Sequence, residues 1–324
     1  MQQNRAPFFI IIGLAVLVVA GLIAGSFFIF GADGDAAPLR RQVEIQVVVA
    51  PGLTAWAEPA ARSFNQQNSG TTITIVEASA LVPTGQLRGP TVAGWIAAAG
   101  FAVETARSQS LQIADAQPVA SSPLAWGGYT SKVEAFGQLD WASFNQRATG
   151  SSGAKLVISA PWNTAEGVAA LASAVAANQN KTTLTGSDVG QADSWLTETL
   201  GNTNTNVRPT PAQDFAGPLG QTLGDAGILT MASWRGARLD QNPNFTLIPV
   251  EPAIALDYPF VVLAGSQATA EAQAAAEAFR AFLLTEAQQA ALANFGLDRA
   301  APSPVQIDSA AANRLVSWAE RELR

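Results

Sequence analysis

The chain has 324 residues, of which 48% are hydrophobic and 13% charged, and its formal net charge is −7. This composition excludes a disordered chain and a coiled coil, and the length supplies material for one large core or two smaller ones. The sequence has no cysteine, no histidine and no cluster of basic residues. We therefore expect no disulfide, no histidine-dependent catalysis, no metal site, no cofactor and no nucleic-acid partner.

An apolar segment without any charge, residues 8–30, comes first along the chain. As a helix it measures about 34 Å, slightly more than the ~30 Å hydrocarbon core of a bilayer. A cleaved signal peptide has a shorter apolar region. We therefore predict an uncleaved transmembrane helix within residues 1–30, followed by a polar linker at residues 31–42. Arg5 precedes the segment and Arg40 and Arg41 follow it, so basic residues alone leave its orientation open.

The body opens with a strand rich in β-branched residues at 43–50, which Pro51 and Gly52 end. A partly helical segment at 53–65 and a second strand at 71–76 follow. The alanine- and glycine-rich stretch after them predicts a helix at 92–99. Further strands are expected at 119–129 (interrupted by Pro123), 156–159, 228–232, 247–250 and 260–263.

Helix starts are marked in the second half of the chain. Asn163 and Glu166 fit an Asn-type capping box, and apolar residues follow them at helical spacing. Further helices are expected at 188–200 and 270–284, and from Thr285 to Gly296. Strands that alternate with helices imply parallel βαβ units, so the predicted fold class is α/β.

Four segments, taken in order, resemble a known family: VVVAPGLTAWAEPAARSFNQQN (47–68), SSPLAWGGYTSKVEAF (121–136), KLVISAPWNTAEGVAAL (155–171) and LDYPFVVLAGSQATAEAQAAAEAFRAFLLTEAQQAALANFGLDR (256–299). They are similar to bacterial extracellular solute-binding proteins with the type II periplasmic-binding fold. The likeness is closest to a surface group in which this domain is paired with a von Willebrand A domain. Since the sequence has no D-x-S-x-S motif, such a partner would be a separate polypeptide.

The resemblance implies two lobes outside the cytoplasm, with residues 43–123 and 258–324 in the first lobe and 124–257 in the second. It also implies a ligand between the lobes, held by hydroxyls and by backbone N–H groups at helix starts, which offer unsatisfied donors. The residues at matching positions are Thr54, Ser79, Ser121, Ser122, Trp162, Asn163, Thr164, Asp257 and Tyr258.

Each candidate also has a purely structural role open to it. Asn163 is expected to cap a helix whatever the function. Thr54 and Ser79 have hydroxyls that can bond to their own backbone in turns. Asp257 and Tyr258 precede a proline, as in a hinge turn.

The sequence contains one pattern that is typical of an enzyme: Ser152 and Lys155 match the S-x-x-K motif. In that chemistry the serine begins a helix and the lysine follows one turn later. Here the tetrapeptide lies in a Gly/Ser-rich loop before a strand, and the sequence has no S-D-N or K-T-G partner motif. We therefore predict that the chain is not an enzyme.

Two functions remain open. The first is a single-pass, membrane-anchored solute-binding protein, which closes two extracytoplasmic lobes over a small polar or anionic ligand. It would serve ABC-type uptake or sensing, with a membrane permease as partner. The alternative is an adhesion or sensor module, which uses the same scaffold for protein contacts without transport and has a von Willebrand A-type surface protein as partner.

Overall fold

The computed structural model describes residues 42–201, 206–265 and 268–324. The predicted membrane span at 8–30, and all but the last residue of the predicted linker, lie outside these residues. In the described part of the chain, no helix combines the length and the apolar character needed to cross a membrane. Residues 42–324 group as one structural unit.

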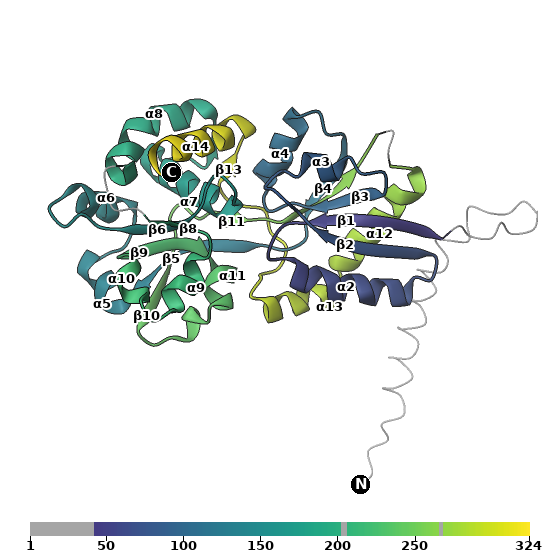
Figure 1. Cartoon of the computed structure of the whole chain (residues 1–324), viewed down its shortest axis with the longest axis horizontal. Helices are drawn as coiled ribbons and strands as arrows, with labels where there is room; N and C mark the ends of the chain where they lie inside the picture. The colour runs from purple at the N-terminus through teal and green to yellow at the C-terminus, as the bar shows by residue number, and fades with distance from the viewer. Residues whose placement is uncertain (1–41, 202–205, 266–267) are drawn as a thin grey trace, which may run out of the picture. The chain divides into compact units, whose positions relative to one another are not determined.

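A five-stranded mixed sheet is the centre of the first lobe. Its strands, in spatial order, are β2 (Thr71–Glu77), β1 (Val43–Val49), β3 (Val92–Ile96), β12 (Pro259–Leu263) and β4 (Ile113–Pro118) (Figure 1). β1 runs parallel to β2 and β3, whereas β12 is antiparallel to both of its neighbours. The β-branched run in β1 is explained by this position, because a central strand is covered on both faces.

The structure corrects the helix predicted at residues 92–99. Val92–Ile96 is the strand β3, and all five of its residues are buried. Between two strands, burial on both faces outweighs the helix preference of alanine. Gly94 marks a close approach, since a Cβ there would lie 2.9 Å from Cζ of the Phe260 ring.

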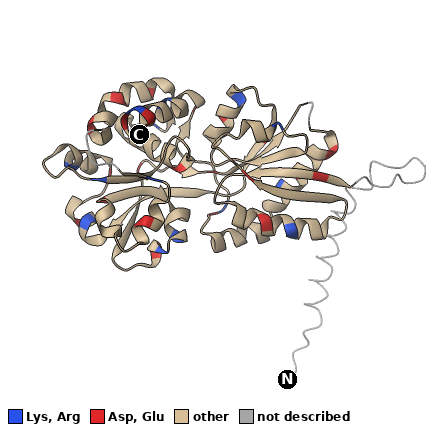
Figure 2. Cartoon of the chain, viewed as in Figure 1, with Lys and Arg blue, Asp and Glu red and all other residues tan. Residues whose placement is uncertain are grey.

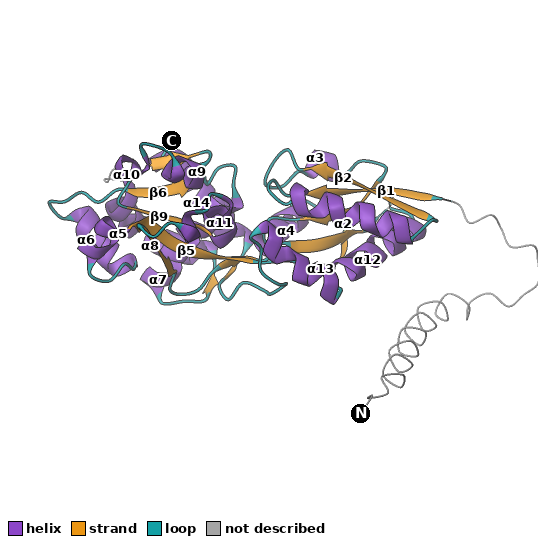
Figure 3. Cartoon of the chain, turned by 90° about the horizontal axis from the view of Figure 1, so that it is seen from below, coloured by secondary structure: helices purple, strands orange, loops and turns teal. Residues whose placement is uncertain are grey.

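Helices cover both faces of this sheet (Figure 3). α2 (Thr54–Gln67) and α12 (Ala270–Leu283) pack together on one face, followed by α13 (Glu286–Ala291). Phe64 of α2 meets Phe279 of α12 edge-on, with ring centroids 5.4 Å apart. The opposite face carries α3 (Thr84–Leu87) and α4 (Gly100–Ser108).

A second mixed sheet is the centre of the second lobe. Its strands are β10 (Phe245–Pro249), β5 (Ser122–Tyr129), β9 (Ala226–Thr230), β6 (Leu156–Ser159) and β8 (Asn206–Arg208). β9, β6 and β8 are parallel, whereas β5 is antiparallel to β9 and β10.

Helices also cover both faces of the second sheet (Figure 1). One side carries α6 (Trp141–Thr149), α7 (Ala165–Gln179) and α8 (Gly186–Leu196). The other side carries α9 (Pro211–Ala216), α10 (Gly220–Leu223) and α11 (Met231–Gly236). α5 (Thr130–Val133) follows β5 and packs Val133 against Gly128, on the face of β5 where Trp126 meets α6. α7 is buried around most of its circumference, which explains why its apolar residues are not confined to one stripe.

Two neighbouring passages of chain connect the sheets. The first leads from β4 into β5, and the second from β11 (Ala255–Leu256) into β12. Leu256 pairs with Ser122 in an antiparallel bridge, and the Val119 N–H donates to the Tyr258 carbonyl at 3.2 Å. The passages therefore lie side by side, as is typical of a hinge between two lobes.

The C-terminal segment, which the predicted division gives to the first lobe, contacts elements of both lobes. β13 (Gln306–Ile307) pairs with β7 (Thr183–Leu184) of the second lobe. α14 (Ser309–Glu322) packs on α7 and α8, and also contacts α4 of the first lobe. Its buried residues form one stripe along the helix, and such a stripe does not specify which neighbour will cover it.

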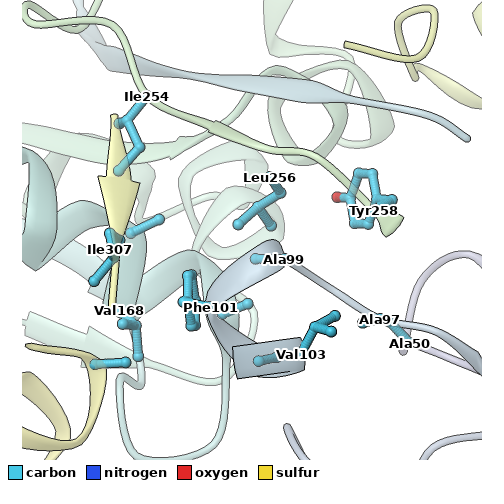
Figure 4. Close-up of a cluster of buried hydrophobic side chains, with 14 of the residues drawn as sticks. Ala50, Ala97, Ala99, Phe101, Val103, Val168, Ile254, Leu256, Tyr258 and Ile307 are labelled. Atoms are coloured by element: carbon cyan, nitrogen blue, oxygen red, sulfur yellow. The ribbon is translucent and has the colours of Figure 1, made fainter. Parts of the chain in front are cut away.

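Apolar packing is continuous between the lobes on one side of the passages. Figure 4 shows Phe101 of α4, Val168 of α7, Leu256 of β11 and Ile307 of β13 in one buried cluster. Phe101 belongs to the first lobe and Val168 to the second. Separation of the lobes at this side would therefore expose apolar surface to water.

Candidate ligand-binding cleft

A cavity of about 730 Å³ is lined by residues of both lobes. In the first lobe its walls are the segments at the ends of β1, β2 and β3, and in the second they are the segments that follow β6, β8 and β9. Each set consists of parallel neighbours, and ligands of α/β sheets bind outside the carboxyl ends of such strands. The volume suits a small molecule. This geometry makes the cavity the candidate site.

Five of the nine predicted site residues lie on the wall of this cavity, and four do not. The five are Ser79, Trp162, Asn163, Thr164 and Tyr258. Contact between these residues and a ligand stays a prediction.

Two of the other four residues, Thr54 and Ser122, make side-chain hydrogen bonds near the wall. The Thr54 hydroxyl donates to the Glu77 carboxylate at 2.9 Å. The Ser122 hydroxyl is fully buried and accepts from the Ala232 N–H at 2.9 Å. Ser122 therefore ties the first passage to the start of α11.

The remaining two hold the passages in place. The Ser121 hydroxyl donates to the Arg299 carbonyl at 2.7 Å. Asp257 is only 8% exposed, and its carboxylate accepts from the Gly100 N–H at 2.7 Å. Burial raises the pKa of Asp257, and hydrogen bonds from backbone N–H groups oppose that effect.

Two residues of the cavity wall, Ser79 in the first lobe and Tyr258 in the second passage, are held in place by their surroundings. The Ser79 N–H and hydroxyl both donate to Oε1 of Gln86, each at 2.8 Å. Tyr258 is 7% exposed and has a positive φ of 32°. Burial raises the pKa of Tyr258, and the charges of Glu166 and Asp257 raise it further, so the phenol keeps its proton at neutral pH.

The structure corrects the start of α7, because Thr164 rather than Asn163 is the N-cap. Thr164 has an extended backbone, and its hydroxyl oxygen accepts from the Gly167 N–H at 3.1 Å. The same hydroxyl donates to the Ala160 carbonyl at 2.8 Å, which fixes the turn one residue later than predicted. Asn163 is left exposed on the cavity wall.

The main polar feature of the cavity is the hydrogen-bonded carboxylate of Glu166, which was not predicted as a site from the sequence. Oε1 of Glu166 accepts from the Thr230 N–H at 2.7 Å, from the Thr230 hydroxyl at 2.8 Å and from the Ser233 hydroxyl at 2.6 Å. Oε2 accepts from the Ser159 hydroxyl. All four residues line the cavity. The available signal was that Ser159 is the last residue of the strand predicted at 156–159. Thr230 was expected inside a strand at 228–232, whereas the structure ends that strand at Thr230.

Among the described residues that line this cavity, Glu166 is the only Asp, Glu, Lys or Arg. Two arginines adjoin the wall, but each is ion-paired: Arg208 with Asp214 at 2.9 Å, and Arg235 with Asp298 at 2.9 Å. Figure 2 shows Lys and Arg at separate positions over the described residues rather than as one basic surface. The charge on the wall is therefore negative.

Large apolar side chains form much of the remaining wall. Phe295 lines the cavity and is 37% exposed. Trp162 is half-buried, and the Arg324 guanidinium lies 5.7 Å from its ring centroid. Such rings can contact the apolar part of a ligand, and their faces attract cations.

The S-x-x-K pattern lacks the geometry that its chemistry needs. Ser152 lies in a turn, and its hydroxyl donates to the Arg147 carbonyl at 2.8 Å. Lys155 immediately precedes β6, and its N–H donates to Asp225 at 2.7 Å. Neither residue lies on the cavity wall. Among the described residues, no group of three or more His, Cys, Asp or Glu side chains is arranged as metal ligands.

Several solved structures share this fold at low sequence identity. The iron-bound HitA from Pseudomonas aeruginosa is 13% identical, with 87% of this chain and 100% of that chain covered and a TM-score of 0.62. AfuA from Actinobacillus pleuropneumoniae, with fructose-6-phosphate bound, is 14% identical, with 86% and 98% covered and a TM-score of 0.60. The sulfate-binding protein SubI from Mycobacterium tuberculosis H37Rv is 15% identical, with 87% and 92% covered and a TM-score of 0.58.

A search among curated proteins finds no match. A family model described as bacterial extracellular solute-binding protein matches residues 45–298. Apart from the first two residues of β1, that range contains both sheets, and it contains all described residues of the cavity wall. The two-lobed α/β fold agrees with this match, and the chain belongs to the bacterial extracellular solute-binding protein family.

Proposed function

We propose that this protein captures a small solute between its two lobes and presents it to a membrane permease for ABC-type uptake. The observation that carries this proposal is the cavity, whose walls come from the carboxyl ends of three parallel strands in each lobe. A ligand held there contacts both lobes at once. Its binding free energy would therefore favour the closed arrangement over an open one.

The paired passages support a hinge motion. β11 and the start of β5 are adjacent, and the Ser121–Asp298 bridge places the chain that leads on to β13 beside them, so a rotation of the lobes changes the backbone at neighbouring residues. The apolar cluster around Phe101 and Val168 lies on one side of these passages. We propose that it stays packed while the cavity opens.

The lobe boundaries that we propose follow the two passages. The first lobe contains residues 43–123 and the return segment that starts at 258, and the second contains residues 124–257. We assign β13 and α14 to the second lobe, because β13 pairs with β7 and α14 packs on α7 and α8.

The N-terminal segment is proposed to keep the protein at the cell membrane as a single-pass anchor. Residues 8–30 contain no charged side chain and are long enough to span a bilayer as a helix. The binding body would then lie outside the cytoplasm, as the name of the family implies.

Thermal unfolding with a panel of solutes tests the proposal. The panel contains oxyanions, ferric iron, sugar phosphates, sugars, amino acids and organic amines. At 100 times Kd a ligand stabilises the folded state by about 2.7 kcal/mol. For a domain of this size we expect a rise in Tm of roughly 5 °C or more.

Two tryptophan variants identify which cavity binds the ligand. Trp162 lines the interlobe cavity, whereas Trp195 lines a different cavity of about 1130 Å³ within the second lobe. Both side chains are half-buried. We expect Trp162→Ala to abolish the ligand-induced rise in Tm and Trp195→Ala to keep it.

The alternative, an adhesion or sensor module with a von Willebrand A-type partner, gives a different result in the same assay. No solute would raise the Tm, and the shift would appear only with a protein partner. That outcome would remove the uptake proposal.

A further inference from the structure

The strand ends of the second lobe form a cluster of hydrogen-bond donors on the cavity wall. The Ser159 hydroxyl comes from the end of β6, the Thr230 hydroxyl and N–H from the end of β9, and the Ser233 hydroxyl from the first turn of α11. Convergent hydroxyl and N–H donors of this kind form a site for an anion.

The side chain of Glu166 already occupies this donor cluster. Its two carboxylate oxygens accept all four of these donors, three of them at 2.6 to 2.8 Å. Glu166 reaches the cluster from the first turn of α7, where a negative charge also neutralises the positive end of the helix. The anion that this wall is built to hold is therefore part of the protein.

The hydroxyls of Ser79 and Thr54, at or near the first-lobe wall, already have acceptors. The Ser79 hydroxyl and N–H both donate to Gln86, and the Thr54 hydroxyl donates to Glu77. The Arg324 guanidinium, which lies 5.7 Å from the Trp162 ring centroid, has an ion pair with Glu320 at 3.6 Å. A doubly charged anion would thus face a carboxylate, and no cationic side chain, among the wall residues that the structure describes.

Repulsion between like charges at such a site is large. Two negative charges a few ångströms apart at a partly buried site repel strongly, because protein and solvent screen them much less than bulk water does. Juxtaposed like charges are a general means of rejecting wrong ligands.

We infer that Glu166 is a built-in anion that excludes doubly charged oxyanions from the cleft, so that the ligand presents a neutral or singly cationic hydrogen-bond donor to this wall. The apolar part of such a ligand would lie against Trp162 and Phe295. This inference rests on the proposed function for the identity of the site, but its test does not require the natural ligand.

Titration calorimetry with sulfate, molybdate and phosphate tests the inference directly. The full chain is compared with Glu166→Ala, which vacates the donor cluster, and with Glu166→Gln, which keeps the side-chain shape without the charge. Glu277→Gln, on an exposed position of α12, is the matched control for loss of one negative charge. Circular dichroism establishes that each variant is folded.

We expect no binding of the three oxyanions by the wild-type protein or by Glu277→Gln. Glu166→Ala should gain binding of at least one of them, with affinity at least about tenfold above that of the wild type, because donors are freed and repulsion is removed. Glu166→Gln should gain less, since its side chain still fills the cluster.

Two results would overturn the inference. In the first, the wild-type protein binds an oxyanion and Glu166→Ala binds it no better, which leaves the proposed solute-binding function intact. In the second, Glu166→Ala and Glu166→Gln are both folded, but Glu166→Ala gains no binding of any of the three oxyanions. Conversely, a gain in Glu166→Ala supports the inference even if every solute in the wild-type panel fails, so the two proposals fail separately.

Discussion

The carboxylate of Asp257 accepts a hydrogen bond from the N–H of Gly100 at 2.7 Å, across 157 positions of sequence. Asp257 lies between β11 and β12 in the second passage, and Gly100 is the first residue of α4. The bond fixes the second passage to the first lobe next to the apolar cluster of Figure 4. A residue predicted to contact ligand therefore holds the hinge.

Replacement of Asp257 by asparagine should change how stability depends on pH. Burial raises the pKa of Asp257 above its ordinary 3.8. A raised folded pKa stabilises the protein below the unfolded pKa, and that stabilisation is lost as the pH rises through the folded pKa. Asp257→Asn carries no charge and keeps an oxygen for Gly100. We therefore expect its stability relative to wild type to increase from pH 3 to pH 7, measured by urea unfolding.

Asp240→Asn, at an exposed position, is the control for this series. If Asp257→Asn were less stable than wild type by the same amount at every pH, the buried charge of Asp257 would not determine the difference in stability.

Loss of Arg235 should weaken the contact between the lobes. The Arg235 guanidinium of α11 donates to the Gly296 carbonyl at 3.0 Å and to the Asp298 carboxylate at 2.9 Å, both on the far side of the hinge. The pair is partly exposed, so we expect Arg235→Ala to lower the free energy of unfolding by only about 0.5–1 kcal/mol. X-ray scattering should show a larger radius of gyration. Arg62→Ala, which removes an ion pair within α2, should leave the radius unchanged.

The corrected cap of α7 predicts different results at neighbouring positions. Thr164→Ala removes the acceptor for the Gly167 N–H and should cost about 1 kcal/mol of folding free energy. Asn163→Ala should leave stability within about 0.5 kcal/mol of wild type, because the side chain is exposed. Chemical denaturation of both variants checks this. A larger loss of folding free energy for Asn163→Ala than for Thr164→Ala would indicate that Asn163 caps the helix after all.

Gly167 is required where α7 passes under the end of β6. A Cβ at this position would lie 2.3 Å from the Ser159 carbonyl oxygen and 2.8 Å from the Pro161 backbone. Backbone atoms have little freedom to move, so Gly167→Ala should destabilise the fold by about 1–3 kcal/mol. It should also displace Glu166 and therefore alter ligand binding. Gly85→Ala, where a Cβ meets nothing within 4 Å, should not destabilise the protein, and thermal unfolding compares the two.

Elements with a strong local pattern were predictable from the sequence. The strand at 156–159 has the predicted bounds, and the helix predicted at 270–284 ends one residue earlier, at Leu283. Residues 92–99 were misread because alanine and glycine carry little periodicity. Their strand exists because β1 and β12 flank it on both sides, a fact that no local window contains.

The candidate site was predictable only in part. Trp162, Asn163 and Thr164 directly follow a buried strand, and the carboxyl end of a parallel strand meets the cleft in this fold class. Ser121 and Asp257 lie in the passages and bond to partners more than 150 positions away. Their partners depend on how the passages pair, which the sequence does not show.

By itself, the sequence determined the α/β class, the apolar N-terminal segment and the lack of histidine and cysteine chemistry, because these follow from composition and from local periodicity. The tertiary structure alone decided that α14 packs on α7, α8 and α4 and that the donors at the ends of β6 and β9 meet Glu166. The physical reason is that burial leaves a periodic trace along the chain. The choice of a hydrogen-bond or packing partner depends on which distant segments the fold brings together.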